Sequence, residues 1–76
     1  MTPTARARMD RLIARVRVEL ELRNNAHVPY ARMVLVLSAS AWRLLADGGA
    51  TGVFSGVRVV VEMDGESEFE ILEIQR

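Results

Sequence analysis

A chain of 76 residues that contains no cysteine has to hold its fold together by packing alone. A domain of this size buries little more than about 60% of the surface that its unfolded chain exposes, so its core is small. Half of its residues are nevertheless hydrophobic, which is high for a soluble domain. We therefore expect one domain over residues 1–76 that buries surplus apolar surface by self-association, as a homodimer or a higher oligomer.

The charge is neutral overall but unevenly distributed along the chain. Residues 1–32 carry seven arginines against three acidic residues, whereas residues 33–76 carry three arginines against seven acidic residues. Such asymmetry indicates pairing between the two halves of the fold, pairing between copies, or a separate partner for each end. No apolar run approaches the roughly 18 residues of a membrane span, and the first nine residues lack the apolar core of a signal peptide. We expect a cytoplasmic protein with no membrane partner.

The first third of the chain contains two different hydrophobic patterns. Thr2 or Thr4 can cap a short helix that starts near Pro3. From Arg15 to Arg23, apolar residues alternate strictly with charged ones, which is typical of a half-buried strand. The alternative is one continuous helix to Leu22, because several apolar residues also follow helical spacing and the charges form i,i+4 pairs. We favour the strand, because the helix would leave two apolar side chains exposed to water.

The remaining elements follow from apolar runs and turn residues. Residues 33–37 are apolar throughout and predict a central strand. A helix capped by Ser38 or Ser40 should run to Ala46, where two glycines end it. Residues 53–63 and 66–74 then predict two strands joined as a hairpin at Asp64-Gly65.

The last strand is apolar on both faces. Phe69 and Ile71 share one face, whereas Leu72 and Ile74 share the other. Either the register shifts near Ile71 or a partner covers this end of the strand. The predicted fold class is α+β: a short N-terminal helix, then ββαββ, with an antiparallel or mixed sheet covered on one face by helices.

The chemistry-bearing residues do not form a pattern typical of an enzyme. His27 is the only histidine, and the serines lack the Gly-x-Ser-x-Gly context of a nucleophile. The cluster Gly48, Gly49 and Gly52 lies between a helix and a strand, whereas phosphate-binding loops lie between a strand and a helix. We expect no catalytic residues, no metal site and no cofactor.

Two charged surfaces and one aromatic residue remain as candidate binding sites. The first surface is an acidic row on the predicted hairpin, which could bind a basic protein groove; it comprises Glu62, Asp64, Glu66, Glu68 and Glu70. The second is an N-terminal basic cluster that could contact phosphates: Arg6, Arg8, Arg11, Arg15 and Arg17. Solvated surface is the favoured interpretation of both charged sets, and core packing is the favoured interpretation of Trp42. We predict little nucleic-acid binding at physiological salt.

Residues 33–63 also resemble a known family. The segment from Leu35 to Leu45, followed by a glycine-rich loop and the strand from Phe54 to Val61, is similar to a strand-helix-strand segment of the major capsid proteins of tailed phages. The resemblance implies a small phage or prophage protein. We expect a non-enzymatic interaction module that self-associates and binds a host or viral protein, as an inhibitor of a host factor in the host cytoplasm. A minor virion or assembly protein, and a small nucleic-acid-binding regulator, are the alternatives.

Overall fold

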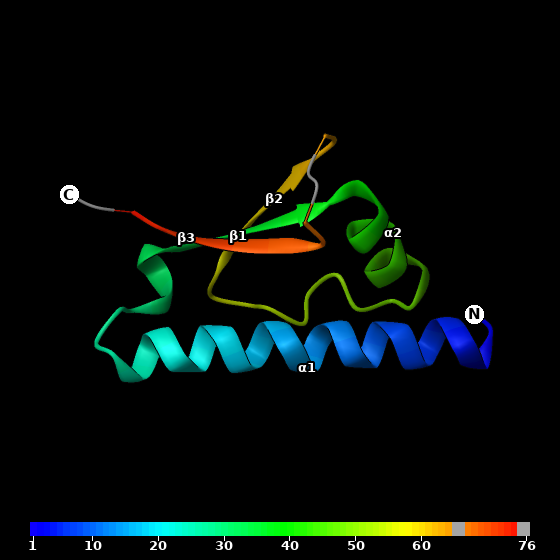
Figure 1. The fold of residues 1–76 in the computed structure, drawn as a ribbon, viewed down its shortest axis with the longest axis horizontal. Coiled ribbons are helices and arrows are strands. Elements are labelled where there is room, and N and C mark those ends of the chain that lie inside the picture. Colours follow the sequence, from blue (N-terminus) through cyan, green and yellow to red (C-terminus); the bar gives the residue numbers. More distant parts are fainter. Residues whose placement is uncertain (65–66, 75–76) are drawn as a thin grey trace.

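The computed structural model describes residues 1–64 and 67–74. It contains a long helix α1 (Pro3–Asn25), a 3₁₀ turn (Tyr30–Arg32), strand β1 (Met33–Ser38), helix α2 (Ala39–Asp47), and strands β2 (Arg58–Glu62) and β3 (Phe69–Glu73) (Figure 1). The chain is therefore a small α+β protein with a mixed sheet. Its element order differs from the predicted ββαββ arrangement in two places.

The first difference is that residues 15–23 are helical. Thr2 caps α1 by accepting a hydrogen bond from the amide of Ala5 at 3.1 Å, and the helix continues through the predicted strand to Asn25. Four apolar side chains at helical spacing are buried along it: Met9, Leu12, Val16 and Leu20. The prediction of a strand is wrong, because the helix tolerates Val18 and Leu22 outside the core, where they are 55% and 59% exposed.

The second difference concerns strand pairing. The strand order is β2-β1-β3, with β1 parallel to β2 and antiparallel to β3. The predicted hairpin between residues 53–63 and 66–74 is wrong, because β2 and β3 lie on opposite sides of β1. Gly65 and Glu66 lie outside the described residues. The central position predicted for residues 33–37 is confirmed.

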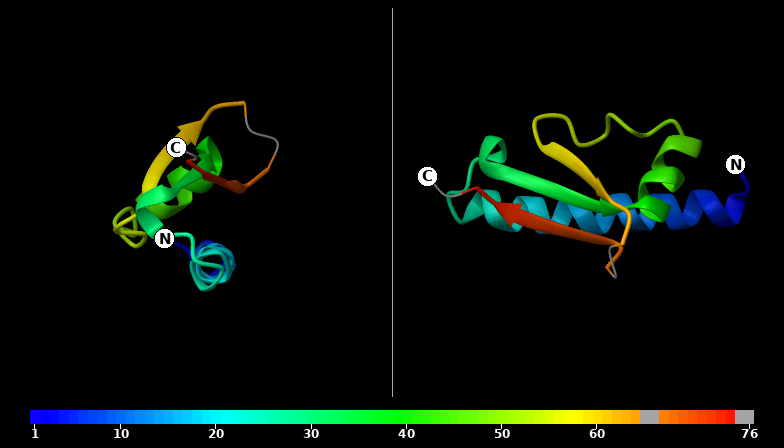
Figure 2. Two further views of the ribbon diagram at one scale, coloured as in Figure 1. Left: turned by 90° about the vertical axis from the view of Figure 1, so that its left-hand side faces the viewer. Right: turned by 90° about the horizontal axis from the view of Figure 1, so that it is seen from above.

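The two faces of the sheet have different surroundings. Met33, Leu35 and Leu37 of β1 have no exposed surface and belong to one core cluster with the buried side chains of α1. Viewed from above the sheet, β1, β2 and β3 lie in front of α1, and in the described part of the chain no helix lies over them (Figure 2). We call this uncovered side the bare sheet face; its apolar residues are Val34, Val36, Val60 and Leu72.

Helix α2 and the following loop complete the core on the α1 side. Ser38 caps α2 as predicted, with its hydroxyl accepting a hydrogen bond from the Ala41 amide at 3.2 Å. The helix ends at Gly48, and Gly49 adopts the left-handed conformation (φ 68°) that closes the turn. Residues 48–57 then return toward α1 and bury Phe54.

Candidate functional site

The predicted acidic row is divided among different parts of the fold. Glu62 ends β2 and lies beside Ser38 of β1, whereas Glu70 belongs to β3 and lies beside Val36. Asp64 is exposed beyond the end of β2. These residues therefore do not form one hairpin surface, although both strands bring carboxylates to the sheet.

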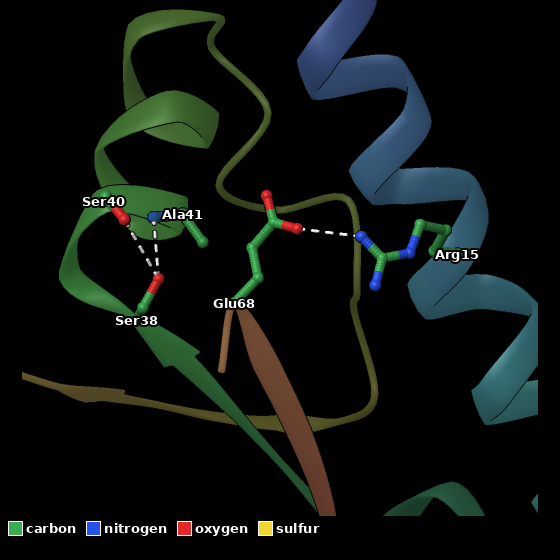
Figure 3. A network of polar contacts seen from close by, with 5 residues as sticks. All are labelled: Arg15, Ser38, Ser40, Ala41 and Glu68. Carbon is green, nitrogen blue, oxygen red and sulfur yellow. Dashed lines mark hydrogen bonds and ion pairs between the residues drawn. The ribbon is translucent and has the colours of Figure 1, made fainter. Parts of the chain in front are cut away.

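Glu68 joins the acidic and basic halves of the chain. Its Oε2 atom accepts a hydrogen bond from Nη1 of Arg15 at 2.9 Å, across the gap between β3 and α1 (Figure 3). The guanidinium of Arg15 also lies 5.4 Å from the centroid of the Phe69 ring. Because both charged side chains are partly exposed, the pair contributes little to stability. It does fix the position of Arg15 beside β3.

The N-terminal arginines all lie on α1 but not on one face. Arg8, Arg11 and Arg15 line a small cavity of about 110 Å³ together with Glu68. Arg17 instead lines a cavity of about 210 Å³ on the other flank of the helix, beside Tyr30 and Phe54. The predicted basic cluster is thus reduced to three arginines, one of which is already paired.

The remaining single residues have structural surroundings. Trp42 is half-buried on α2 and packs against the core cluster. His27 is exposed and adopts a left-handed backbone conformation (φ 70°) just after α1. Within residues 1–64 and 67–74, no group of histidine and acidic side chains has the arrangement of a metal site.

A groove runs between α1 and β3, with a volume of about 620 Å³. Its helix wall includes Arg15, Val18 and Glu19, and its strand wall is formed by residues 69–71. The strand wall is also the outer edge of the sheet, because within the described part of the chain β3 pairs with β1 alone. We call this feature the β3 groove. Sequence analysis missed it because it depends on residues 15–23 being helical.

The bare sheet face combines apolar residues with opposite charges at its two ends. Val60 and Leu72 are 44% and 46% exposed. Arg58 lies at the end where β1 begins and lines a cavity of about 310 Å³ with Arg32 and Ile74. Glu62 lies at the opposite end, beside Ser38. The sequence did indicate a second apolar face, because Leu72 and Phe69 have to point to opposite sides of β3.

Comparisons with known proteins do not add to this description. No protein-family model matches the chain, and searches of curated proteins and of solved structures found no significant match. Neither helix of residues 1–64 and 67–74 has the length and apolar character needed to cross a lipid bilayer.

Proposed function

We propose that this chain is a non-enzymatic protein-interaction module that binds an extended segment of a partner protein in the β3 groove. The observation that carries the proposal is the free outer edge of β3 beside an open groove. Stoichiometric binding of this kind suits an inhibitor of a host factor, acting in the host cytoplasm if the chain is phage-encoded. A phage origin is what the resemblance of residues 33–63 to capsid proteins implies.

The hydrogen bonds between β1 and β3 identify which backbone groups are free. Ser38 donates its amide to the carbonyl of Glu68 at 3.0 Å, and Ile74 donates to the carbonyl of Arg32 at 2.7 Å. In an antiparallel ladder the residues between such pairs alternate in direction. The amides and carbonyls of Phe69, Ile71 and Glu73 therefore point away from β1, toward the position that an added strand would occupy.

The walls of the β3 groove can recognise side chains of an added strand. Val18 offers apolar surface, and the aliphatic stems of the arginines extend it. Two arginines of the groove are already in ion pairs, Arg15 with Glu68 at 2.9 Å and Arg23 with Glu19 at 2.8 Å. Glu70 adds a further carboxylate to the groove. Main-chain hydrogen bonds would provide affinity, and the groove would select alternate side chains, as in other complexes formed by strand addition.

The test compares two substitutions at Glu73, whose side chain is exposed. Glu73→Pro removes one outward amide and keeps the amides that pair with β1, whereas Glu73→Ala removes the same side chain and keeps the amide. Short peptides selected from a displayed library on the parent protein serve as probes. We expect them to bind the parent and Glu73→Ala, and to bind Glu73→Pro at least about tenfold more weakly.

A second measurement uses the parent protein alone, so its result does not depend on whether the proline variant folds. In the parent protein, bound peptide should slow hydrogen exchange at the amides of Phe69, Ile71 and Glu73. Equal affinity for Glu73→Pro and Glu73→Ala, or peptide binding without protection of these amides, would rule out strand addition at β3.

Nucleic-acid binding is the second candidate function, and one observation favours it. Arg8, Arg11 and Arg15 face one cavity on the same flank of α1. If these residues contact phosphates, affinity for duplex DNA should fall steeply as salt increases, and Arg8→Ala with Arg11→Ala should remove it. We expect the parent protein to bind DNA weakly at physiological salt, and tight retention there would reverse the order of the two candidates.

A further inference from the structure

We propose that the bare sheet face binds the same face of a second copy, so that two sheets pack against each other in a symmetric dimer. This surface meets the β3 groove at Glu70, which lies at the margin of both. Its other residues do not line the groove, and the inference does not depend on the proposed function. The two-fold axis would lie in the interface and run across the strands, near the level of Val36 and Val60. The partner strands would then run in opposite directions.

The apolar content of the bare sheet face is the first argument. Along β1, Val34 and Val36 alternate with the buried residues 33, 35 and 37, so they point to the opposite side of the sheet. Val60 lies level with Val36, and Leu72 lies level with Val34, so both share that side. Val60 and Leu72 are nearly half exposed in the single chain. Two three-stranded sheets packed through such faces form the arrangement of a small sandwich, with a shared second core.

The charges identify the occupant as a second copy. A symmetric interface requires a surface that is complementary to itself. On the bare sheet face, Arg58 lies level with Val34 near the start of β1, and Glu62 lies level with Ser38 at its end. Rotation about an axis across the strands places the basic end of one copy over the acidic end of the other. Rotation about an axis along β1 would instead bring the basic ends of both copies to the same end of the interface, and Arg58 would not face Glu62.

The same geometry creates one unfavourable contact. Glu70 lies level with Val36 at the margin of the face, so the axis brings it near its own counterpart. Its side chain is exposed, and salt screens repulsion between exposed carboxylates. Glu70→Gln should therefore strengthen the dimer at low salt.

The main test uses two charge reversals and their mixture, measured by sedimentation equilibrium of the full chain. In Arg58→Glu, residue 58 repels Glu62 of the other copy, and in Glu62→Arg, residue 62 repels Arg58. We expect each variant alone to dimerise at least about tenfold more weakly than the parent protein. An equimolar mixture should form a heterodimer with near-parental affinity, because both contacts are again between opposite charges.

Two leucines provide a matched control for the apolar part of the interface. Leu72 lies on the bare sheet face and Leu22 on the outer side of α1, with 46% and 59% of their surfaces exposed. Leu72→Arg should weaken the dimer by about tenfold or more, since it buries an unpaired charge. Leu22→Arg should leave the dimer unchanged.

Each result decides the inference. Weak single variants, a restored mixture and a selective effect of Leu72→Arg support it. A parent protein that stays monomeric at high micromolar concentration overturns the inference. A dimer whose affinity is unchanged by Arg58→Glu and Glu62→Arg overturns it too. The inference is also overturned if the mixture of Arg58→Glu and Glu62→Arg dimerises as weakly as each variant alone. In that case residues 58 and 62 do not face each other across the interface.

Discussion

The two faces of the sheet are built from alternate residues of β1 but have opposite surroundings. Met33, Leu35 and Leu37 belong to the core cluster that includes side chains of α1 and have no exposed surface, whereas Val34 and Val36 are only partly buried. The covered face therefore carries most of the packing that stabilises the single chain. The bare sheet face contributes less to the stability of the monomer and is available for association. Alternate residues of the same strand can therefore serve two purposes, stability on one face and binding on the other.

The largest effect should come from the covered face. Leu35→Ala removes a side chain with no exposed surface from the centre of the core cluster. We expect the free energy of unfolding to fall by about 2 to 5 kcal/mol, in a chain whose total stability is on the order of 4 to 11 kcal/mol. Urea denaturation measures the loss. A cost below about 1 kcal/mol would mean that the faces do not differ as described.

The boundary between β1 and α2 should show an intermediate effect. Ser38 ends the strand and caps the helix by accepting a hydrogen bond from the Ala41 amide. Ser38→Ala leaves that amide without its side-chain partner, so we expect a loss of about 1 kcal/mol. Ser40→Ala is the control, since the Ser40 hydroxyl lies within hydrogen-bond distance of the Ser38 hydroxyl at 3.2 Å but does not cap the helix. If the two variants lose the same amount, the cap is not responsible.

A smaller loss of stability is expected from the ion pair between Glu68, just before β3, and α1. Glu68→Gln removes the ion pair with Arg15, which is exposed on both sides. The loss should be about 0.2 to 1 kcal/mol and should diminish in high salt, because exposed charges are screened. Thermal unfolding at low and high ionic strength separates the charge term from packing. A loss that does not depend on salt would argue against an electrostatic contribution.

The smallest effect on the monomer should come from the bare sheet face. Val60→Thr keeps the β-branched shape and replaces a methyl group by a hydroxyl on a side chain that is 44% exposed. Measured at a concentration where monomers dominate, its stability should change by no more than about 0.5 kcal/mol. A large loss from this variant would show that the bare sheet face is part of the monomer core.

Local patterns predicted some of this fold correctly. The apolar run of residues 33–37 correctly predicted the central strand. Ser38 and Gly48 correctly predicted the two ends of α2. The interpretation of residues 15–23 failed because the apolar residues there satisfy both a two-residue and a helical period. Burial of Val16 and Leu20 against the sheet decides between them, and that contact depends on strands much later in the chain.

The pairing of β2 and β3 could not be predicted from the Asp64-Gly65 signal. A turn sequence favours a hairpin only when its flanking strands are free to pair, and here both pair with β1. The N-terminal arginines do not share one face, because a helix distributes successive side chains around its axis. Among residues 1–64 and 67–74, the ion pair between Arg15 and Glu68 is the one that joins the basic and acidic halves of the chain.

The position of β1 also affects how quickly the chain can fold. The central strand is the first strand in the sequence, and both of its neighbours follow it: Val34 pairs with Arg58 on one side, and Met33 pairs with Glu73 on the other. Contacts between such distant residues require closure of long loops, which slows folding relative to helical proteins of similar length. During synthesis, α1 and α2 can form early, but β1 has both neighbours only after residue 73 has left the ribosome. From the synthesis of residue 38 until that of residue 73, the nascent chain therefore carries an apolar strand that is incompletely paired, and a chaperone would protect it most in this interval.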